Sequence, residues 1–432
     1  MPWSELPEPE RMQRVAVVAP AEGAEAVLRS LGHSGRVELD AAAADPAGDG
    51  AVGLAEVLDR MVRSGPVVAT PGWCPATQVA EVARSVAPLG ASLVRLPTRA
   101  GSAPPTLISG RGATGAFQPL VDTYGTVPYR DLNPAAFAGL SYVLMFGMMF
   151  GDVGHGLLLV ALGAVIRWAR PARLARWAPV SAFVIGCGAA SAAAGLLYGD
   201  AFGPTGLVPV LWIRPVDHPT TLLGVALVGG GILLAASYGL GTANRWREAG
   251  PVPALVALTG AAGAALYAGL AAAALGVLYG VTPLAGAGVV AAGAGLVAGF
   301  VGCLVAAGGR GGGVLQAAVE MFDATLRIGS NTVSFSRLAA FGLTHAALGQ
   351  VIWAGTSGLW ARGPALWVGA AALFVMGNAA AFALEGLVAA VQALRLEYYE
   401  MFSRVFVTEG RPFRPWRLER TEDEREASCS PG

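Results

Sequence analysis

Long apolar runs occupy most of the chain after residue 133. Each is about 18–28 residues long, the length that a helix needs to cross a hydrocarbon core about 30 Å thick. Of the 432 residues, 54% are hydrophobic and only 13% are charged, whereas a soluble domain has about 25% charged residues. We therefore predict an α-helical polytopic membrane protein.

We expect about eight transmembrane helices, at residues 134–151, 153–168, 178–199, 220–241, 252–280, 283–308, 333–360 and 365–400. The runs are rich in glycine and alanine, and such small residues let helices pack closely in lipid. Residues 312–330 are too polar to span, so we expect them to form an amphipathic helix on the membrane surface.

Arginine placement predicts the orientation of the chain. Arginines cluster in 167–177, in 244–250 and after the last span, whereas the opposite loops carry few. By the positive-inside rule both termini are then cytoplasmic, and an even number of spans gives the same result. Residues 1–13 are acidic and lack the basic start and apolar core of a signal peptide. We expect the plasma membrane of a prokaryote.

Residues 14–100 show alternating strand and helix patterns. Strands are expected at 14–20, 36–40, 66–72 and 91–97, and helices at 22–32, 57–65 and 76–90. Two βαβ halves of this kind predict a small cytoplasmic α/β domain with a ferredoxin-like fold. The expected domains are a disordered N-terminus (1–13), this α/β domain (14–100), a linker (101–133), a transmembrane domain (134–403) and a cytoplasmic tail (404–432).

Composition also excludes several functions. The 29 basic and 29 acidic residues balance, so nothing favours nucleic acid as a partner. The four cysteines show no metal-ligand spacing. No Gly-Lys-Ser/Thr phosphate loop is present. We therefore expect no bound metal or cofactor and no ATP chemistry on this chain.

Ionisable residues inside the last two spans are the strongest functional signal. Arg337 follows Ser334 by three residues, and His345 lies beside the same helical stripe. In the last span Asn378, Glu385 and Gln392 are seven residues apart, and Arg395 joins their face.

Such a polar face lines an aqueous path or a protein interface, because a charge at a helix centre costs about 2.5–3.5 kcal/mol. The structural alternatives are that Arg337 snorkels to the cytoplasmic surface, and that Glu385 forms an ion pair with an arginine that holds helices together.

Two further segments hold acidic residues near the ends of spans. Asp152 and His155 fall at the turn between the first two spans, and Asp200 follows the third. These residues lack the ligand set of a metal site, and a turn-capping aspartate is one interpretation. A channel mouth on the non-cytoplasmic side is the other.

Four segments together resemble the membrane stator subunit of V-type and A-type rotary ATPases, called subunit a or subunit I. They are "FGMMFGDVGHG" (146–156), "GLLYGDAFG" (195–203), "NTVSFSRLAAFGLTHAAL" (331–348) and "LEGLVAAVQALRLEYYEMFSRVFVTEGRPFRPW" (384–416). The similarity extends roughly over 65–432 and includes "PGWCP" (71–75).

The resemblance implies that a ring of proteolipid subunits rotates past this chain, and that two half-channels bring protons or sodium ions to a carboxylate of the ring. By motif, Arg337 and Arg395 face the ring, and Glu385 and His345 line the path. The implied partners also include peripheral stalk subunits, a central-stalk adaptor and, indirectly, the catalytic ATPase head. The chain itself would not be an enzyme.

The chain departs from the family in its N-terminal region. Full-length members have two lobes joined by a long coiled coil, whereas about 40 residues separate the two halves here and no heptads are visible. We expect a shortened proximal lobe, with weakened stalk binding. Two alternatives remain: a stand-alone secondary transporter or channel, and a truncated paralogue with a structural or assembly role.

Overall fold

The computed structural model describes residues 9–40, 53–98, 103–108, 115, 117–169, 178, 180–307, 311–405 and 410–418. These residues form two compact units. The α/β unit takes the described parts of Met1–Ser109, Gly125–Asp131 and Thr408–Gly432, and the helical unit takes those of Gly110–Tyr124 and Leu132–Val407.

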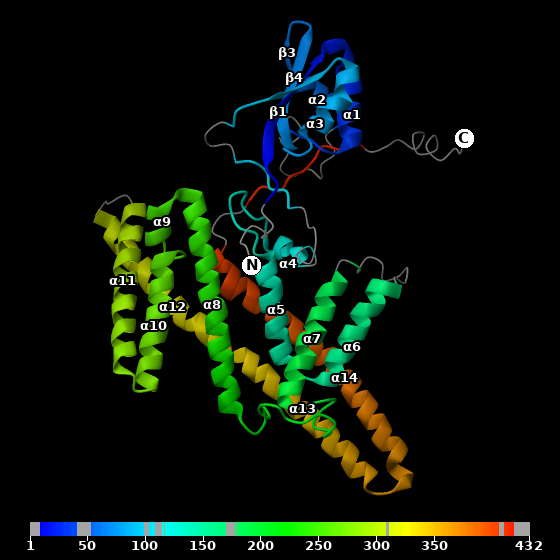
Figure 1. Cartoon of the computed structure of the whole chain (residues 1–432), viewed down its shortest axis with the longest axis vertical. Coiled ribbons are helices and arrows are strands. Elements are labelled where there is room, and N and C mark those ends of the chain that lie inside the picture. The colour runs from blue at the N-terminus through cyan, green and yellow to red at the C-terminus, as the bar shows by residue number, and fades with distance from the viewer. Residues whose placement is uncertain are drawn as a thin grey trace. The chain divides into compact units, whose positions relative to one another are not determined.

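The α/β unit is built on an antiparallel sheet. Its strands are β1 (Met12–Pro20), β2 (Glu38–Leu39), β3 (Val62–Ser64), β4 (Val67–Pro75) and β5 (Ser92–Arg95). Their order is β2-β4-β1-β5, and β3 pairs with β4. Alternate residues of β1 (Val15, Val17 and Ala19) are buried. They belong to one core with apolar residues of α1 (Ala24–Ser34) and α3 (Val79–Val86), which lie along the sheet (Figure 1).

The helix expected at 57–65 is wrong in its second half. Helix α2 (Leu54–Asp59) ends early, and β3 then forms a hairpin with β4. Gly65 occupies the turn with φ of +59°, a left-handed conformation that favours glycine. Proline follows it and cannot continue a helix, so the Gly-Pro pair favours the turn.

Residues 410–418 belong to the α/β unit. Trp416 is 3% exposed and lies in the core of that unit. An Nη2 atom of Arg411 lies 2.7 Å from Oε1 of Glu38, and the backbone N–H of Arg414 donates to Oε2 of Glu38 over 2.7 Å. The segment after the last helix therefore completes the core that the N-terminal strands begin.

The helical unit contains the predicted apolar helices. Its elements are α4 (Gln118–Tyr124), α5 (Ala135–Met149), α6 (Val153–Ala164), a π-turn (Val165–Ala169), α7 (Ser181–Tyr198), α8 (Pro219–Ala249), α9 (Pro251–Val256), α10 (Ala261–Leu278), α11 (Thr282–Ala306), α12 (Gly311–Ser334), α13 (Ser336–Trp360), α14 (Trp367–Leu396), a second π-turn (Glu397–Phe402) and α15 (Ser403–Val405).

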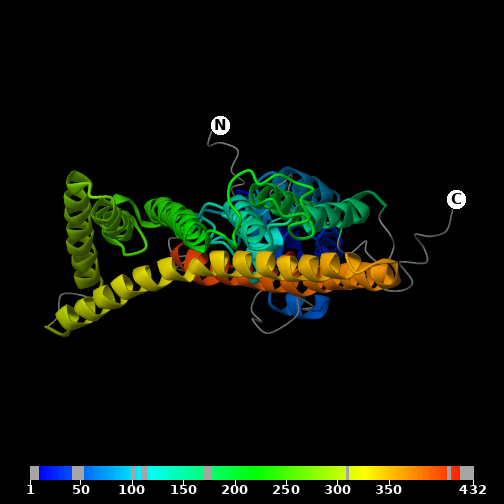
Figure 2. The same ribbon diagram turned by 90° about the horizontal axis from the view of Figure 1, so that it is seen from below.

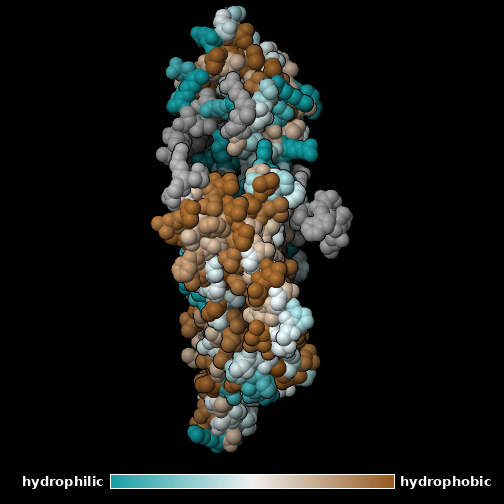
Figure 3. Space-filling view, turned by 90° about the vertical axis from the view of Figure 1, so that its left-hand side faces the viewer, coloured by the Kyte–Doolittle hydropathy of each residue, from teal (hydrophilic) through white to brown (hydrophobic). Residues whose placement is uncertain are grey.

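Six helical segments among the described residues are long and apolar enough to cross a membrane. The first two expected spans form shorter apolar helices, Ala135–Met149 and Val153–Trp168. Hydrophobic side chains cover much of the helical face seen in Figure 3, whereas hydrophilic ones gather on the α/β unit. The chain is thus a mostly helical, multi-pass membrane protein with a small N-terminal antiparallel sheet.

The polar segment expected on the membrane surface forms α12, which continues almost directly into α13. The two helices are separated at Phe335, a fully buried residue. Its ring packs so closely on Gly230 of α8 that a Cβ atom there would lie 2.1 Å from it. The break in the long helix therefore coincides with this buried contact. Helices α13 and α14 then run side by side (Figure 2).

Candidate functional site

The turn between α5 and α6 is organised around a buried carboxylate. Asp152 is 1% exposed and caps the N-terminus of α6, where its Oδ1 accepts a hydrogen bond from the backbone N–H of His155 over 2.9 Å. The same oxygen accepts from the N–H of Phe202, and Oδ2 accepts from the N–H of Gly203, both over 3.0 Å. Phe202 has a φ of +54°, so the loop after α7 takes a strained conformation to reach this carboxylate.

Glycines let this turn and α7 approach each other. A Cβ atom at Gly195 would lie 2.3 Å from the backbone nitrogen of Val153, and one at Gly154 would lie 2.5 Å from the ring of Phe202. These contacts give a packing reason for the glycines in "FGDVGHG" and "GLLYG". The motifs therefore place Asp152 and His155 against the end of α7.

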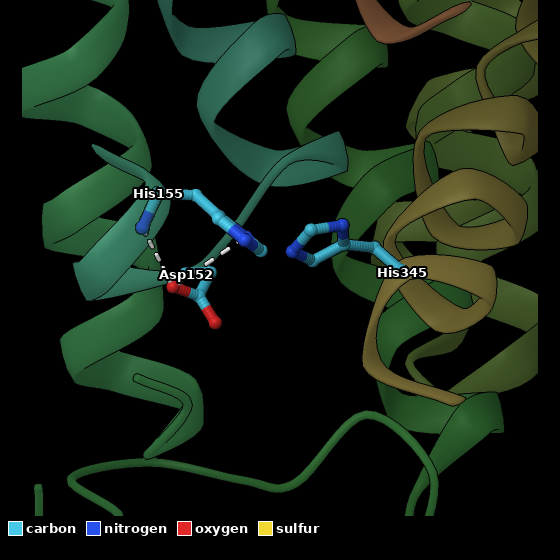
Figure 4. Close-up of side chains that lie close together, drawn as sticks. All are labelled: Asp152, His155 and His345. Atoms are coloured by element: carbon cyan, nitrogen blue, oxygen red, sulfur yellow. Dashed lines mark hydrogen bonds and ion pairs between the residues drawn. The ribbon is translucent and has the colours of Figure 1, made fainter. Parts of the chain in front are cut away.

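Histidines from two distant segments meet beside Asp152. The ring centroids of His155 on α6 and His345 on α13 are 5.5 Å apart, and the ring of Phe150 packs against both. Nδ1 of His345 is hydrogen-bonded to the carboxylate of Glu385 on α14. Both histidines are buried, at 2% and 6% exposed. Figure 4 shows the two rings facing each other across the turn.

A small cavity adjoins this cluster. It is lined by Asp152, His155, Asp200, Gly203, His345, Ala346, Gly349 and Ala381. The structure therefore brings together five of the residues that the sequence indicated. They are Asp152, His155, Asp200, His345 and, through its hydrogen bond, Glu385.

A second polar cluster lies around the start of α13 and the π-turn after α14. Nη2 of Arg337 lies 2.7 Å from Oε1 of the buried Glu400. Glu397 is fully buried, and its Oε2 accepts from Oγ of Ser141 over 2.8 Å. The guanidinium of Arg404 lies 5.3 Å from the ring centroid of Tyr238.

Glu397, Glu400 and Arg404 were not singled out from the sequence. Their spacing of three and four residues places them on one helical face of their own, and this was the signal available. Arg337 therefore has an acidic partner within its own chain, whereas the sequence argument placed its partner on a neighbouring subunit.

The other indicated residues do not join either cluster. Asn378 is buried and donates to the carbonyl oxygen of Phe374 in its own helix. Gln392 is half-buried, and Ser334 ends α12 rather than belonging to α13. Arg395 is exposed, and no hydrogen bond or ion pair joins it to another residue within the described ranges.

Taken together, the fold and the site define a multi-pass membrane protein with ionisable side chains buried between its helices. Residues 57–203 and 314–418 match the model of the V-type ATPase 116kDa subunit family. These two stretches contain the acidic residues, histidines and arginines of both polar clusters. The chain belongs to this family.

Individual relatives agree with the family match. The chain is 30% identical over 349 residues to the A-type ATP synthase subunit I of Aeropyrum pernix, which covers 70% of this chain and 50% of the relative. It is 25% identical over 324 residues to the A-type ATP synthase subunit I of Pyrococcus horikoshii, covering 72% and 47%. A segment of 80 residues is 46% identical to the human V-type proton ATPase 116 kDa subunit a 3, covering 18% of this chain and 9% of the relative. The chain spans about half the length of each archaeal relative.

Proposed function

We propose that this chain is the membrane stator subunit of a V/A-type rotary ATPase. In this role it forms half-channels for protons or sodium ions against a rotating proteolipid ring, and it couples ion flow to ATP hydrolysis or synthesis on other subunits. The chain carries no ATP site of its own in this proposal. Family membership supports the proposal, and one feature of α14 carries it furthest.

That feature is Arg395, which is exposed and has no ion-pair partner among the residues that the structure describes. It continues a stripe of α14 formed by Leu384, Leu387 and Val391, which are 65%, 64% and 54% exposed. Arginine keeps its charge in every protein environment. A fixed cation on an apolar helix face is costly in lipid, so this face calls for a partner that supplies an anionic group. A membrane-embedded carboxylate on a rotating proteolipid has the required chemistry.

The two polar clusters supply the two half-channels in this proposal. Asp152, His155 and His345 lie on one path, and Glu397 and Glu400 lie on the other. His345 is eight residues beyond Arg337, or about 12 Å along the α13 axis. The clusters are thus offset along the α13–α14 hairpin. The charges of Arg337, in the second cluster, and of Arg395 oppose a direct leak between the two paths by electrostatic repulsion.

The remaining features follow from the same role. We propose eight spans, with α5 and α6 as the first two, and both termini in the cytoplasm of a prokaryote. The strand order β2-β4-β1-β5 with helices after β1 and β4 supports a ferredoxin-like α/β unit. Peripheral stalk subunits and a central-stalk adaptor are the further partners, and the catalytic head is an indirect one.

The test is ion pumping by the reconstituted complex. We expect Arg395→Gln to abolish ATP-driven ion uptake into vesicles while the complex still assembles, because the ring carboxylate loses its fixed counter-charge. Arg362→Gln, at an exposed arginine in the loop after α13, is the matched control. Normal pumping by Arg395→Gln would overturn the proposal. Ion movement by the purified chain alone would instead favour a self-contained transporter.

A further inference from the structure

Three metal-binding side chains converge beside the turn between α5 and α6. One ligand atom each from Asp152, His155 and His345 lies within 4.8 Å of the other two, and all three residues are buried. Among the described residues, this is the one group of three or more histidine, cysteine, aspartate or glutamate side chains that is close enough together to hold a metal ion. The sequence interpretation excluded a metal because it considered only Asp152 and His155, and the third ligand comes from α13 (Figure 4).

Each of the three side chains is prepared for a metal in a different way. Hydrogen bonds from three backbone N–H groups hold the Asp152 carboxylate in place. Oδ1 accepts two of these bonds and Oδ2 accepts one, so Oδ2 keeps a free lone pair for a metal. Because Nδ1 of His345 is bonded to Glu385, its Nε2 is left to face the cluster. A histidine that ligates a metal usually donates its other ring nitrogen to a carboxylate in this manner.

His155 provides an independent indication. Its side chain is 3% exposed, and within the described ranges neither ring nitrogen has a hydrogen-bond partner. An unpaired polar group in the protein interior costs about 1–3 kcal/mol. A metal ion bound to one nitrogen would remove part of this cost, and the nearest approach of His155 Nδ1 to a carboxylate oxygen is 3.7 Å, to Oδ1 of Asp152.

The ligand set and the charge both fit a zinc ion. Two imidazoles and one carboxylate are ordinary zinc ligands at about 2.0–2.2 Å, which places tetrahedral ligand atoms roughly 3.4 Å apart. Nδ1 of His155 lies 3.7 Å from the Asp152 carboxylate, and the three ligand atoms already lie within 4.8 Å of one another. Side-chain rotations that move these atoms by about 1.4 Å or less therefore bring all three to the separation that zinc needs. The charges of Asp152 and Glu385 offset a dication, and Asp200, which lines the same cavity, or water can complete the coordination.

We propose that Asp152, His155 and His345 form a zinc-binding site, and that zinc bound there blocks ion translocation. The metal would sit beside the small cavity that Asp152, His155 and His345 line, and it would hold His345 and its partner Glu385 in place. The path beside these side chains would then be closed to a moving ion. The binding site stands on its own geometry. Only the blocking effect rests on the proposed function.

The binding test uses the full chain, purified in detergent and stripped of metal. Titration with Co²⁺ should give the visible absorption of a tetrahedral site at one ion per chain, and Zn²⁺ should displace it. His155→Ala and His345→Ala should each weaken Zn²⁺ binding at least ~100-fold, and Glu385→Gln by roughly 10–100-fold because the outer partner of a ligand is lost. His218→Ala, in an exposed loop, is the matched control.

Circular dichroism of each variant checks that the helices are retained. Glu385→Gln is a further safeguard, because glutamine has nearly the same size and shape as glutamate. Unchanged Zn²⁺ affinity in folded His155→Ala and His345→Ala, or no binding at one ion per chain in the unmodified protein, would overturn the site.

The blocking test uses the reconstituted complex with Zn²⁺ added to the side opposite the ATPase head. Half-inhibition of pumping should occur within about threefold of the Zn²⁺ dissociation constant, and a chelator should restore it. If Zn²⁺ binds but pumping continues, blocking is wrong and the proposed function stands. If Zn²⁺ binds and no complex pumps ions, the proposed function fails and the site stands.

Discussion

At the residue scale, the buried charges of the helical unit are largely compensated within the chain. Glu385 is hydrogen-bonded to His345, and Arg337 forms an ion pair with Glu400. Among the described residues the partner of Glu385 is thus a histidine, and no arginine forms the structural ion pair with it that was one alternative. Arg395, by contrast, is exposed and forms no ion pair within the described part of the chain. The two arginines have different surroundings, although the sequence presents them as equivalent.

Glu400→Gln is expected to destabilise the helical unit. It leaves the Arg337 guanidinium, which is 25% exposed, beside a neutral amide. The free energy of unfolding should fall by about 2 kcal/mol, between the values for losing an exposed and a buried ion pair. We would measure it as a lower unfolding midpoint in detergent.

A double-mutant cycle with Arg337→Gln isolates the ion pair, because removing both charges should cost less than the sum of the single changes. Glu56→Gln removes an exposed helical pair of the α/β unit and is the control. Strictly additive effects of Glu400→Gln and Arg337→Gln would show that the pair contributes nothing to stability.

At the element scale, glycine positions decide how closely the membrane helices approach. Helices α10 and α11 pack so tightly that a Cβ atom at Gly288 would lie 2.3 Å from the backbone nitrogen of Ala273. Gly293, on the same helix, has no atom within 4 Å of such a position. Composition alone predicted close packing but could not tell these two glycines apart.

Gly288→Leu should therefore force α10 and α11 apart, whereas Gly293→Leu should fit without a clash. We expect overpacking to lower the free energy of unfolding of Gly288→Leu by about 1–3 kcal/mol. For Gly293→Leu, a surface change, the decrease should be less than about 0.5 kcal/mol. Unfolding midpoints of the two variants in the same detergent provide the comparison. Equal midpoints would mean that α10 and α11 are not packed through Gly288.

Periodicity predicts elements well and contacts between elements poorly. The apolar runs predicted the helices, and the alternation of apolar and polar residues predicted β1 and β4. Both succeeded because each pattern lies within one segment of the sequence. The hairpin of β3 was missed because the Gly65 turn overrides a weak helical pattern. His345 joins Asp152 and His155 only through tertiary packing, so no local spacing could have predicted that cluster. Glu397 and Glu400 are three residues apart, which places them on one side of a helix, but they follow Arg395, the last residue of the polar face that we expected on the final span.

At the scale of the whole molecule, the two ends of the described chain meet in one fold. Trp416 and Leu418 pack with the core that β1 and α1 form. The backbone N–H of Trp416 also donates to the carbonyl oxygen of Val37 over 2.9 Å. The α/β unit is therefore complete only when the segment after α14 is in place, and its stability reports on both ends of the chain at once.

Glu38 makes that stability depend on pH. Burial raises the pKa of its carboxyl, although the N–H of Arg414 and the charge of Arg411 oppose the shift. Because the pKa is raised in the folded state, the unfolded chain releases its proton first as the pH rises. The contribution of Glu38 is therefore fully present below its ordinary pKa of 4.5, and it is lost as the pH rises through the higher folded value.

Glu38→Gln should remove this dependence, because the amide oxygen can still accept from Arg414 and carries no charge. Relative to the variant, the unmodified chain should lose protection of residues 410–418 as the pH rises above the ordinary pKa of 4.5. Hydrogen–deuterium exchange of the full chain in detergent measures this, and comparison at each pH cancels the intrinsic exchange rate. Glu56→Gln controls for the loss of an exposed carboxylate from the same unit. If the unmodified chain instead gains protection over the variant as the pH rises, the ion pair with Arg411 outweighs the cost of burying the Glu38 charge.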